Sequence, residues 1–447
     1  MKKTLKVIAV IFLLLLIIVA IPAFIPDDEY TPGAKQWLDE ANSMVELPIA
    51  QNSFNALVGF SVREGEDTIA VGAAMVEEVN KKIKQYRAGG KTKPVVDPRW
   101  TVEELKLTDE FADKVLRDNP VEWLRKNPDS YQKQLADNQV LLSRCRQLTT
   151  MKQYSNYVIT DVNAPYIPLS VLISTSRLNN LSIIHDYTTG RQKRAINRLS
   201  DSIHFSRLML KESRLLINKM IALALLGINL NTYSILQDSA SFKPEYRLHI
   251  KNLNNQERSM RRVFQGEFAF MSTAFNAQSM GEDAMDTPVL DDIYIKLYLK
   301  HRKLENMAHK KIWLPLLAQE SMTLAQRKEQ NDIGNDDASW WDYYVDPVGN
   351  ILLNIATPAY VGYIDTVDHA DATISLLNIK NEIYAKNMKV DEIEKYIASF
   401  DMSANPGYSE ATLSLNKEDG TLTYVIPGYT DENIPSLKVL NIENNNR

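Results

Sequence analysis

The sequence contains almost no cysteine and none of the short motifs that identify common enzyme classes. Cys145 is the only cysteine, so no intramolecular disulfide can form, and the surrounding LLSRCRQLTT predicts a helix that buries it. The patterns HExxH and GxSxG, the P-loop, GxGxxG and a CxxC pair are all missing. Nucleotide binding and dithiol redox chemistry therefore have no support in the sequence, and we predict no cofactor.

An excess of positive charge is missing as well. The chain carries 51 Lys and Arg against 56 Asp and Glu, a net charge of -5, which argues against a nucleic-acid partner. Its 45% hydrophobic and 24% charged residues are typical of a globular protein, so its 447 residues can bury a large core.

A long apolar run opens the chain. Residues 7–25 include no charged or strongly polar side chain, and as a helix they would span roughly 28 Å, close to the thickness of a bilayer core. Three lysines precede the run and three acidic residues follow it, which favours a cytoplasmic amino terminus. We predict a cytoplasmic segment at 1–6 and a single-pass transmembrane signal anchor at 7–25, in a bacterial inner membrane. Cleavage near Ala23 is the alternative.

The remainder predicts a mainly α fold, a multi-helical extracytoplasmic domain in the periplasm. We expect a tether and first helices at 26–100, a central helical core at 101–330, an acidic and aromatic loop at 331–350, and C-terminal helices at 351–400. The segment LINKMIALALLGINL is apolar on nearly all sides, which predicts the central buried helix. Residues 401–447 predict a small β-hairpin and a tail, because alternating apolar residues flank Asp419-Gly420.

Four segments resemble a family of uncharacterised bacterial proteins with one amino-terminal membrane segment. These segments are NSFNALVGF, DNQVLLSRCRQL, LINKMIALALL and DPVGNILLNIATPAYVGYI. The resemblance extends from about residue 52 to about residue 386 and implies a single-pass, mainly helical protein. It implies no activity, no substrate and no site residues.

One helical pattern brings potential metal ligands together. His301, Glu305 and His309 are spaced four apart, which places them on one face of a helix. Two imidazoles and a carboxylate can bind zinc. Four basic residues crowd the same segment and oppose a cation, so an exposed polar stripe is the competing interpretation.

Four aromatic residues in the acidic loop are candidates for contacting a partner: Trp340, Trp341, Tyr343 and Tyr344. Large aromatic side chains beside acidic ones can cap a core, anchor a protein partner or contact the membrane interface. The acidic residues around them predict a solvated loop, with calcium binding as the alternative, although the EF-hand spacing is missing.

Two further charged features have simple structural interpretations. In DTVDHADAT, Asp365 and His369 are four apart and predict an ion pair on a helix surface, with a catalytic role as the alternative. Basic groups at 191–194 and 258–262 predict solvated helix faces, or contacts with anionic lipid head groups.

These patterns lead to one expected function and two alternatives. The expected function is a membrane-tethered periplasmic protein that interacts with an envelope protein or supports the envelope. The alternatives are a metal-dependent hydrolase of an envelope component, through His301, Glu305 and His309, and a carrier that holds an apolar ligand in a cleft between helices.

Overall fold

The computed structural model describes residues 21–43, 45, 47–89, 115–116, 119–162, 164, 169–239, 242–275, 299–330, 345–346, 362–429 and 434–439. Within these ranges the fold is mainly helical with a small C-terminal antiparallel sheet, which confirms the mainly α part of the predicted fold class. Residues 1–20 of the predicted cytoplasmic segment and anchor lie outside the described residues, so the N-terminal membrane span stays a prediction.

The helices follow one another along nearly the whole described chain. Their bounds are α2 (Pro32–Asn42), α3 (Ser53–Val58), α4 (Thr68–Arg87), α6 (Pro120–Lys126), α7 (Pro128–Asp137), α8 (Gln139–Thr150), α9 (Leu169–Thr188), α10 (Gln192–Glu212), α11 (Leu216–Gln237), α12 (Asn255–Arg258), α13 (Arg261–Phe275), α15 (His301–Ala308), α16 (Leu314–Ala318), α17 (Leu324–Glu329), α20 (Tyr363–Lys386) and α21 (Val390–Ala398). A five-residue π-helical turn, η5 (His309–Trp313), joins α15 to α16.

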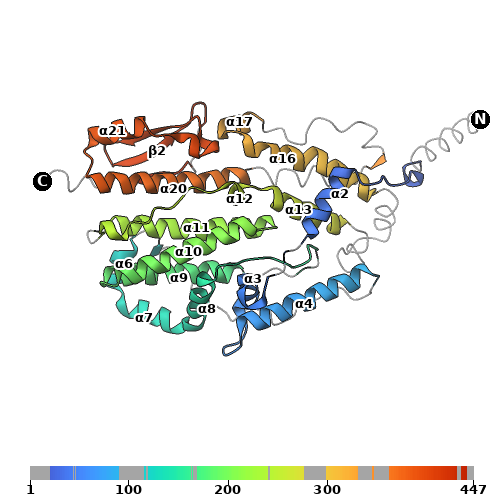
Figure 1. The fold of residues 1–447 in the computed structure, drawn as a ribbon, viewed down its shortest axis with the longest axis horizontal. Helices are drawn as coiled ribbons and strands as arrows, with labels where there is room; N and C mark the ends of the chain where they lie inside the picture. Colours follow the sequence, from blue (N-terminus) through green and yellow to red (C-terminus); the bar gives the residue numbers. More distant parts are fainter. Residues whose placement is uncertain are drawn as a thin grey trace, which may run out of the picture.

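Helix α20 connects the two hydrophobic clusters of the molecule. Its residues Val367 and Ile374 belong to the large cluster that includes α8 to α11, whereas Leu376 and Ile383 belong to a smaller cluster with α21 and the sheet. In Figure 1, α20 accordingly lies between α11 on one side and the layer of α21 and β2 on the other. A helix that is buried on two faces holds the C-terminal part on the helical body.

The predicted core helix is confirmed as α11. It packs against α9, α10 and α20, and side chains such as Leu226 and Tyr233 are fully buried. Among the described residues, α11 is also the one helix long and apolar enough to cross a membrane, but 56% of that apolar stretch is buried inside the protein. Cys145 in α8 is buried too, as predicted, and burial raises the pKa of its thiol to about 11.

An extended segment at residues 247–253 binds along α20 through side-chain amides. Asn378 donates to the carbonyl of Ile250 at 2.7 Å, and Asn381 donates to the carbonyl of Leu248 at 2.9 Å. The two asparagines are three apart and so face the same way on the helix. Their amides replace the partner strand that an extended segment needs for its backbone hydrogen bonds.

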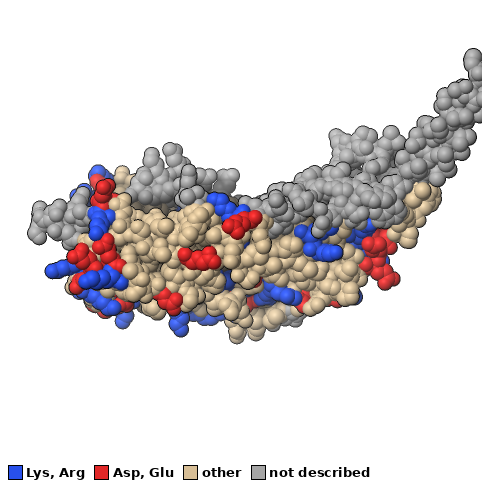
Figure 2. Space-filling model, turned by 90° about the horizontal axis from the view of Figure 1, so that it is seen from above, with Lys and Arg blue, Asp and Glu red and all other residues tan. Residues whose placement is uncertain are grey.

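The predicted C-terminal hairpin is confirmed, with one strand added. Strands β1 (Thr412–Asn416) and β2 (Thr421–Val425) pair antiparallel, with Leu415 opposite Leu422, and Gly420 adopts the positive φ of 75° that the turn needs. A third strand, β3 (Ser436–Lys438), pairs with β2 and was not predicted. Figure 2 looks onto this side of the molecule, where charged side chains are densest at one end and scattered over the rest of the described surface.

Helices α3 and α4 approach each other closely at two glycines. A Cβ added to Gly72 of α4 would lie 2.0 Å from the carbonyl oxygen of Asn55 and 2.8 Å from the amide nitrogen of Gly59. Both neighbours are backbone atoms that cannot move aside, so the contact between the helices depends on glycine at position 72.

We expect Gly72→Ala to lower the free energy of unfolding by about 3 kcal/mol, because the added methyl group forces α3 and α4 apart. Thermal unfolding of the full-length chain in mild detergent, followed by circular dichroism, measures this.

Gly227→Ala is the matched control. Gly227 lies in α11 with no atom within 4 Å of an added Cβ, so alanine should stabilise the helix by about 0.5–1 kcal/mol. Equal effects of the two substitutions would contradict the close packing of α3 on α4.

Candidate functional site

The segment that follows the apolar run is bound to the body of the protein. Asp27 accepts hydrogen bonds from the backbone amides of Arg302 at 2.9 Å and Lys303 at 3.1 Å, so its carboxylate caps the start of α15. These partners are 275 and 276 residues apart in the sequence. We call the contacts of residues 27–40 with α13, α15 and η5 the N-terminal interface.

Asn306 of α15 holds the backbone of this segment from both sides. Its amide nitrogen donates to the carbonyl of Glu29 at 2.8 Å, and its amide oxygen accepts from the backbone amide of Thr31 at 2.9 Å. Next to it, the guanidinium of Arg302 lies 5.6 Å from the centre of the Tyr30 ring, a cation–π contact. These residues belong to the segment predicted to begin with a tether, and α15 binds them directly.

Helix α2 continues the interface with a buried aromatic cluster. Trp37 is 3% exposed, and its ring meets His309 edge-on at 4.9 Å and Phe268 of α13 at 6.3 Å. Gly33 makes room for the imidazole, since an added Cβ would lie 2.8 Å from Cε1 of His309. Figure 1 shows α2 crossing beside α13 and α16.

The structure does not assemble His301, Glu305 and His309 into a metal site. Among the described residues, no group of three or more His, Cys, Asp or Glu side chains is placed to hold a metal ion. His301 and His309 are eight positions apart, which is roughly 12 Å along a helix and too far for one ion. The alternative of an exposed stripe is also wrong for Glu305 and His309, which are buried against residues 27–40.

Burial controls the ionisation of these side chains. It lowers the pKa of both His301 and His309, and the carboxylate of Asp27 opposes it at His301. Burial raises the pKa of Glu305, while the neighbouring hydroxyls of Ser272 and Tyr30 act to lower it. Burial and the nearby Glu305 together raise the pKa of Tyr30. The interface is thus most stable with neutral imidazoles.

The aspartates of DTVDHADAT form a buried network with two arginines. Asp368 accepts from Arg258 of α12 at 2.7 Å and also from Arg327 of α17, while Asp371 accepts from Arg258 at 3.0 Å. Arg327 further lies 2.7 Å from Asp365. Asp368 and Asp371 are at most 5% exposed. Asp365, which was predicted to pair with His369, is 27% exposed and lies against Arg327. Arg258, predicted to lie on a solvated face, joins α12 to α20.

His369 and Asp371 have partners that sequence spacing did not indicate. A ring nitrogen of His369 lies 2.6 Å from the hydroxyl of Tyr408, and Asp371 accepts from the backbone amide of Leu253 at 2.7 Å. Burial raises the pKa of Asp371 to about 6, against the opposing effects of the Leu253 amide and Arg258. This cluster joins α20 to α12, to α17 and to the turn that contains Tyr408. Its paired aspartates and arginines are typical of a structural network.

The remaining predicted site residues and the comparisons with known proteins add no assignment. Trp340, Trp341, Tyr343 and Tyr344 lie outside the described residues, so their role stays a prediction. Comparisons with protein-family models, curated proteins and solved structures found no match to this chain. No sequence signal pointed to Trp37, because its partners lie more than 200 positions away in the chain.

We expect Asp368→Asn to lower the free energy of unfolding by about 3 kcal/mol or more. The substitution leaves two buried guanidinium groups without the charge that they share. Asp39→Asn is the control, because the Lys35–Asp39 pair is 63% and 66% exposed and its loss should cost no more than about 0.5 kcal/mol. Thermal unfolding of both variants measures the difference, and similar values would contradict the network.

The N-terminal interface should become less stable at acidic pH. A buried imidazole with a lowered pKa stabilises the fold above its unfolded pKa of about 6.5, and that stability is lost as the pH falls towards the folded value. Glu305 acts in the opposite sense, since ionisation of a carboxyl with a raised pKa costs stability as the pH rises.

His309→Phe separates the two contributions. The phenyl ring keeps the contact with Trp37 but cannot bind a proton, so the variant should lose less stability than the wild type between pH 7.5 and 5.5. Unfolding at several pH values measures this, with His249→Phe, an exposed histidine, as the control. Identical pH profiles for wild type and His309→Phe would contradict a buried neutral imidazole.

Proposed function

We propose that the chain is a membrane-tethered periplasmic protein whose body interacts with an envelope protein or supports the envelope. The observation that carries this proposal is the N-terminal interface. Residue 27, where the interface begins, is two positions after the end of the apolar run at 7–25. If that run is a membrane anchor, no free linker separates the anchor from the body.

A fixed attachment of the body to the anchor favours a role in which the body is held in one position relative to the membrane. Asp27, Asn306 and the Trp37–His309 contact would hold α13 and α15 at one orientation to the bilayer. The exposed apolar side chains at the end of the run agree with a bilayer nearby, since Phe24 is 84% and Ile21 is 41% exposed in the protein alone. A partner would then meet a defined face at a defined height above the membrane.

The alternative of a metal-dependent hydrolase has less support. Its proposed ligands face residues 27–40 of the chain itself: Asp27 lies near His301, Tyr30 near Glu305 and Trp37 against His309. A metal could reach them only after this segment had left its place, at the cost of the buried Trp37.

Reversible crosslinking in intact membranes, followed by purification of the full-length chain, tests the proposed function. We expect a specific envelope protein in the crosslinked complex and a reporter fused to the carboxyl terminus that is active only outside the cytoplasm. A reporter active only in the cytosol, or no specific partner, would contradict the proposal.

Gly33→Val connects this test to the N-terminal interface. Its side chain would collide with His309 and should reduce the captured partner at least severalfold, while the chain remains in the membrane fraction. Lys35→Ala, on the exposed face of the same helix, should leave capture unchanged. Equal capture by both variants would show that fixed attachment is unimportant.

A further inference from the structure

A buried arginine that forms no ion pair with a carboxylate of the described residues lies just before α11. Arg214 is 5% exposed; its Nη1 donates to the carbonyl of Asn156 at 3.2 Å, and its Nη2 is buried with no hydrogen-bond partner among the described residues. Burial lowers the pKa of Arg214 to about 10, which leaves the side chain charged at neutral pH. Buried charges are normally paired, so this guanidinium has capacity for an anion.

Other hydrogen-bond donors surround the same point. The start of a helix presents backbone amides without intrahelical partners and the positive end of the helix dipole. In α11, the amide of Leu216 donates to Glu267 at 2.6 Å, but in the described part of the chain no partner is found for the amides of Ile217 and Asn218. The Asn218 side chain is 5% exposed and likewise forms no hydrogen bond with a described residue.

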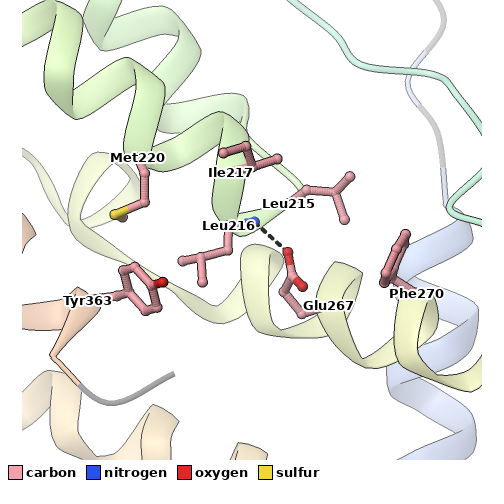
Figure 3. Close-up of a pocket in the computed structure, with 7 residues that line it drawn as sticks. All are labelled: Leu215, Leu216, Ile217, Met220, Glu267, Phe270 and Tyr363. Carbon is pink, nitrogen blue, oxygen red and sulfur yellow. Dashed lines mark hydrogen bonds between the residues drawn. The ribbon is translucent and has the colours of Figure 1, made fainter. Parts of the chain in front are cut away.

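Gly266 of α13 fixes this arrangement. A Cβ at this position would lie 1.7 Å from the carbonyl oxygen of Arg214, so only glycine lets α13 cross so close to the start of α11. The crossing places the adjacent Glu267 where its carboxylate can accept from Leu216, as Figure 3 shows.

Two cavities of different size share side chains at the start of α11. The first has a volume of about 40 Å³ and is lined by Arg214 and Asn218. The second has a volume of about 230 Å³, with Met220 and Tyr363 on its far side in Figure 3. The side chains shared by both cavities are apolar: Leu215, Ile217 and Phe270.

Two carboxylates lie near Arg214 without pairing with its guanidinium. Asp161 lines the smaller cavity but is paired with Arg87 at 2.9 Å. Glu267 lines the larger cavity, where burial raises its pKa and the amide of Leu216 opposes that effect. Neither carboxylate forms an ion pair with Arg214, so Arg214 is a positive group in the lining of the smaller cavity, with the amide of Asn218 beside it.

We propose that these cavities bind a small monocarboxylate with a short aliphatic tail. The carboxylate accepts from the guanidinium of Arg214 and from Asn218, and the tail extends across Leu215, Ile217 and Phe270 into the larger cavity. The larger cavity has several times the volume of the smaller one, so it is the cavity with room for the tail. A phosphate would bring up to two negative charges to one guanidinium.

Calorimetric titration of the full-length chain in non-ionic detergent tests this proposal, which is independent of the proposed envelope role. We use hexanoate as the probe, acetate for the head group alone, hexanol for the tail alone and inorganic phosphate for anion binding without a tail. Hexanoate should bind at least tenfold more tightly than acetate, because its additional methylenes become buried. Hexanol and phosphate should bind more weakly than hexanoate.

Variants locate the binding site. Arg214→Met should weaken hexanoate binding about tenfold or more without lowering the melting temperature of the free protein, since it removes an unpaired buried charge. Asn218→Ala should also weaken binding, and keeps the proposal testable if Arg214→Met does not fold. Glu267→Gln should retain binding, because glutamine can still accept from the Leu216 amide.

Several results would overturn the proposal. Undetectable hexanoate binding, or equal affinity in the wild type and Arg214→Met, would exclude Arg214 as the anion site. A lower melting temperature for Arg214→Met with unchanged hexanoate affinity would assign a purely structural role to the arginine. Equal binding of hexanol would indicate an apolar cavity alone, and equal binding of phosphate would indicate an anion site without tail recognition.

Discussion

The binding of residues 27–40 to α13 and α15 is the contact on which the proposed function depends. One end is polar, with Asp27 capping α15 and Asn306 holding the backbone, and the other is apolar, with Trp37 between His309 and Phe268. The polar contacts set the position of the segment along the helix, and the buried tryptophan is the large aromatic side chain at the apolar end. A membrane anchor that continues into this segment would be joined to a packed surface.

A second constraint lies in α20, which links the helical body to the C-terminal sheet. Its apolar residues serve both hydrophobic clusters, and its buried Asp368 and Asp371 bind arginines from α12 and α17. Replacing such a network by apolar residues can leave the free energy of unfolding unchanged, but removing one partner leaves a buried charge unpaired. Its specific contribution here is to fix α12 and α17 in register on α20.

Much of the fold could be predicted from local patterns, because helices and hairpins depend on nearby residues. Alternation around Asp419-Gly420 located β1 and β2, and the apolar composition of α11 identified the core helix. The apolar composition did not predict the role of Lys219, which is buried in α11. Its ammonium group donates to the carbonyls of Glu257 and Ser259 at 2.8 and 2.7 Å. A single charged residue within an apolar stretch gives no sign of the distant carbonyls that satisfy it.

The candidate site was harder to predict, because its partners are far apart in the sequence. The four-residue spacing of His301, Glu305 and His309 correctly indicated a shared helix face, but a spacing does not identify what covers that face. The cover is the chain's own N-terminal segment, more than 260 positions earlier. Likewise, no pattern in the sequence indicates that Arg214 is buried and that its Nη2 has no hydrogen-bond partner among the described residues.

Hydrogen exchange of the full-length chain in membranes tests the N-terminal interface most directly. The backbone amides of Thr31, Arg302 and Lys303 are bonded across this interface, so we expect them to exchange as slowly as amides within α11 and α20. Exchange of these three amides at unprotected rates, while α11 and α20 remain protected, would show that residues 27–40 are a free tether and would contradict the account.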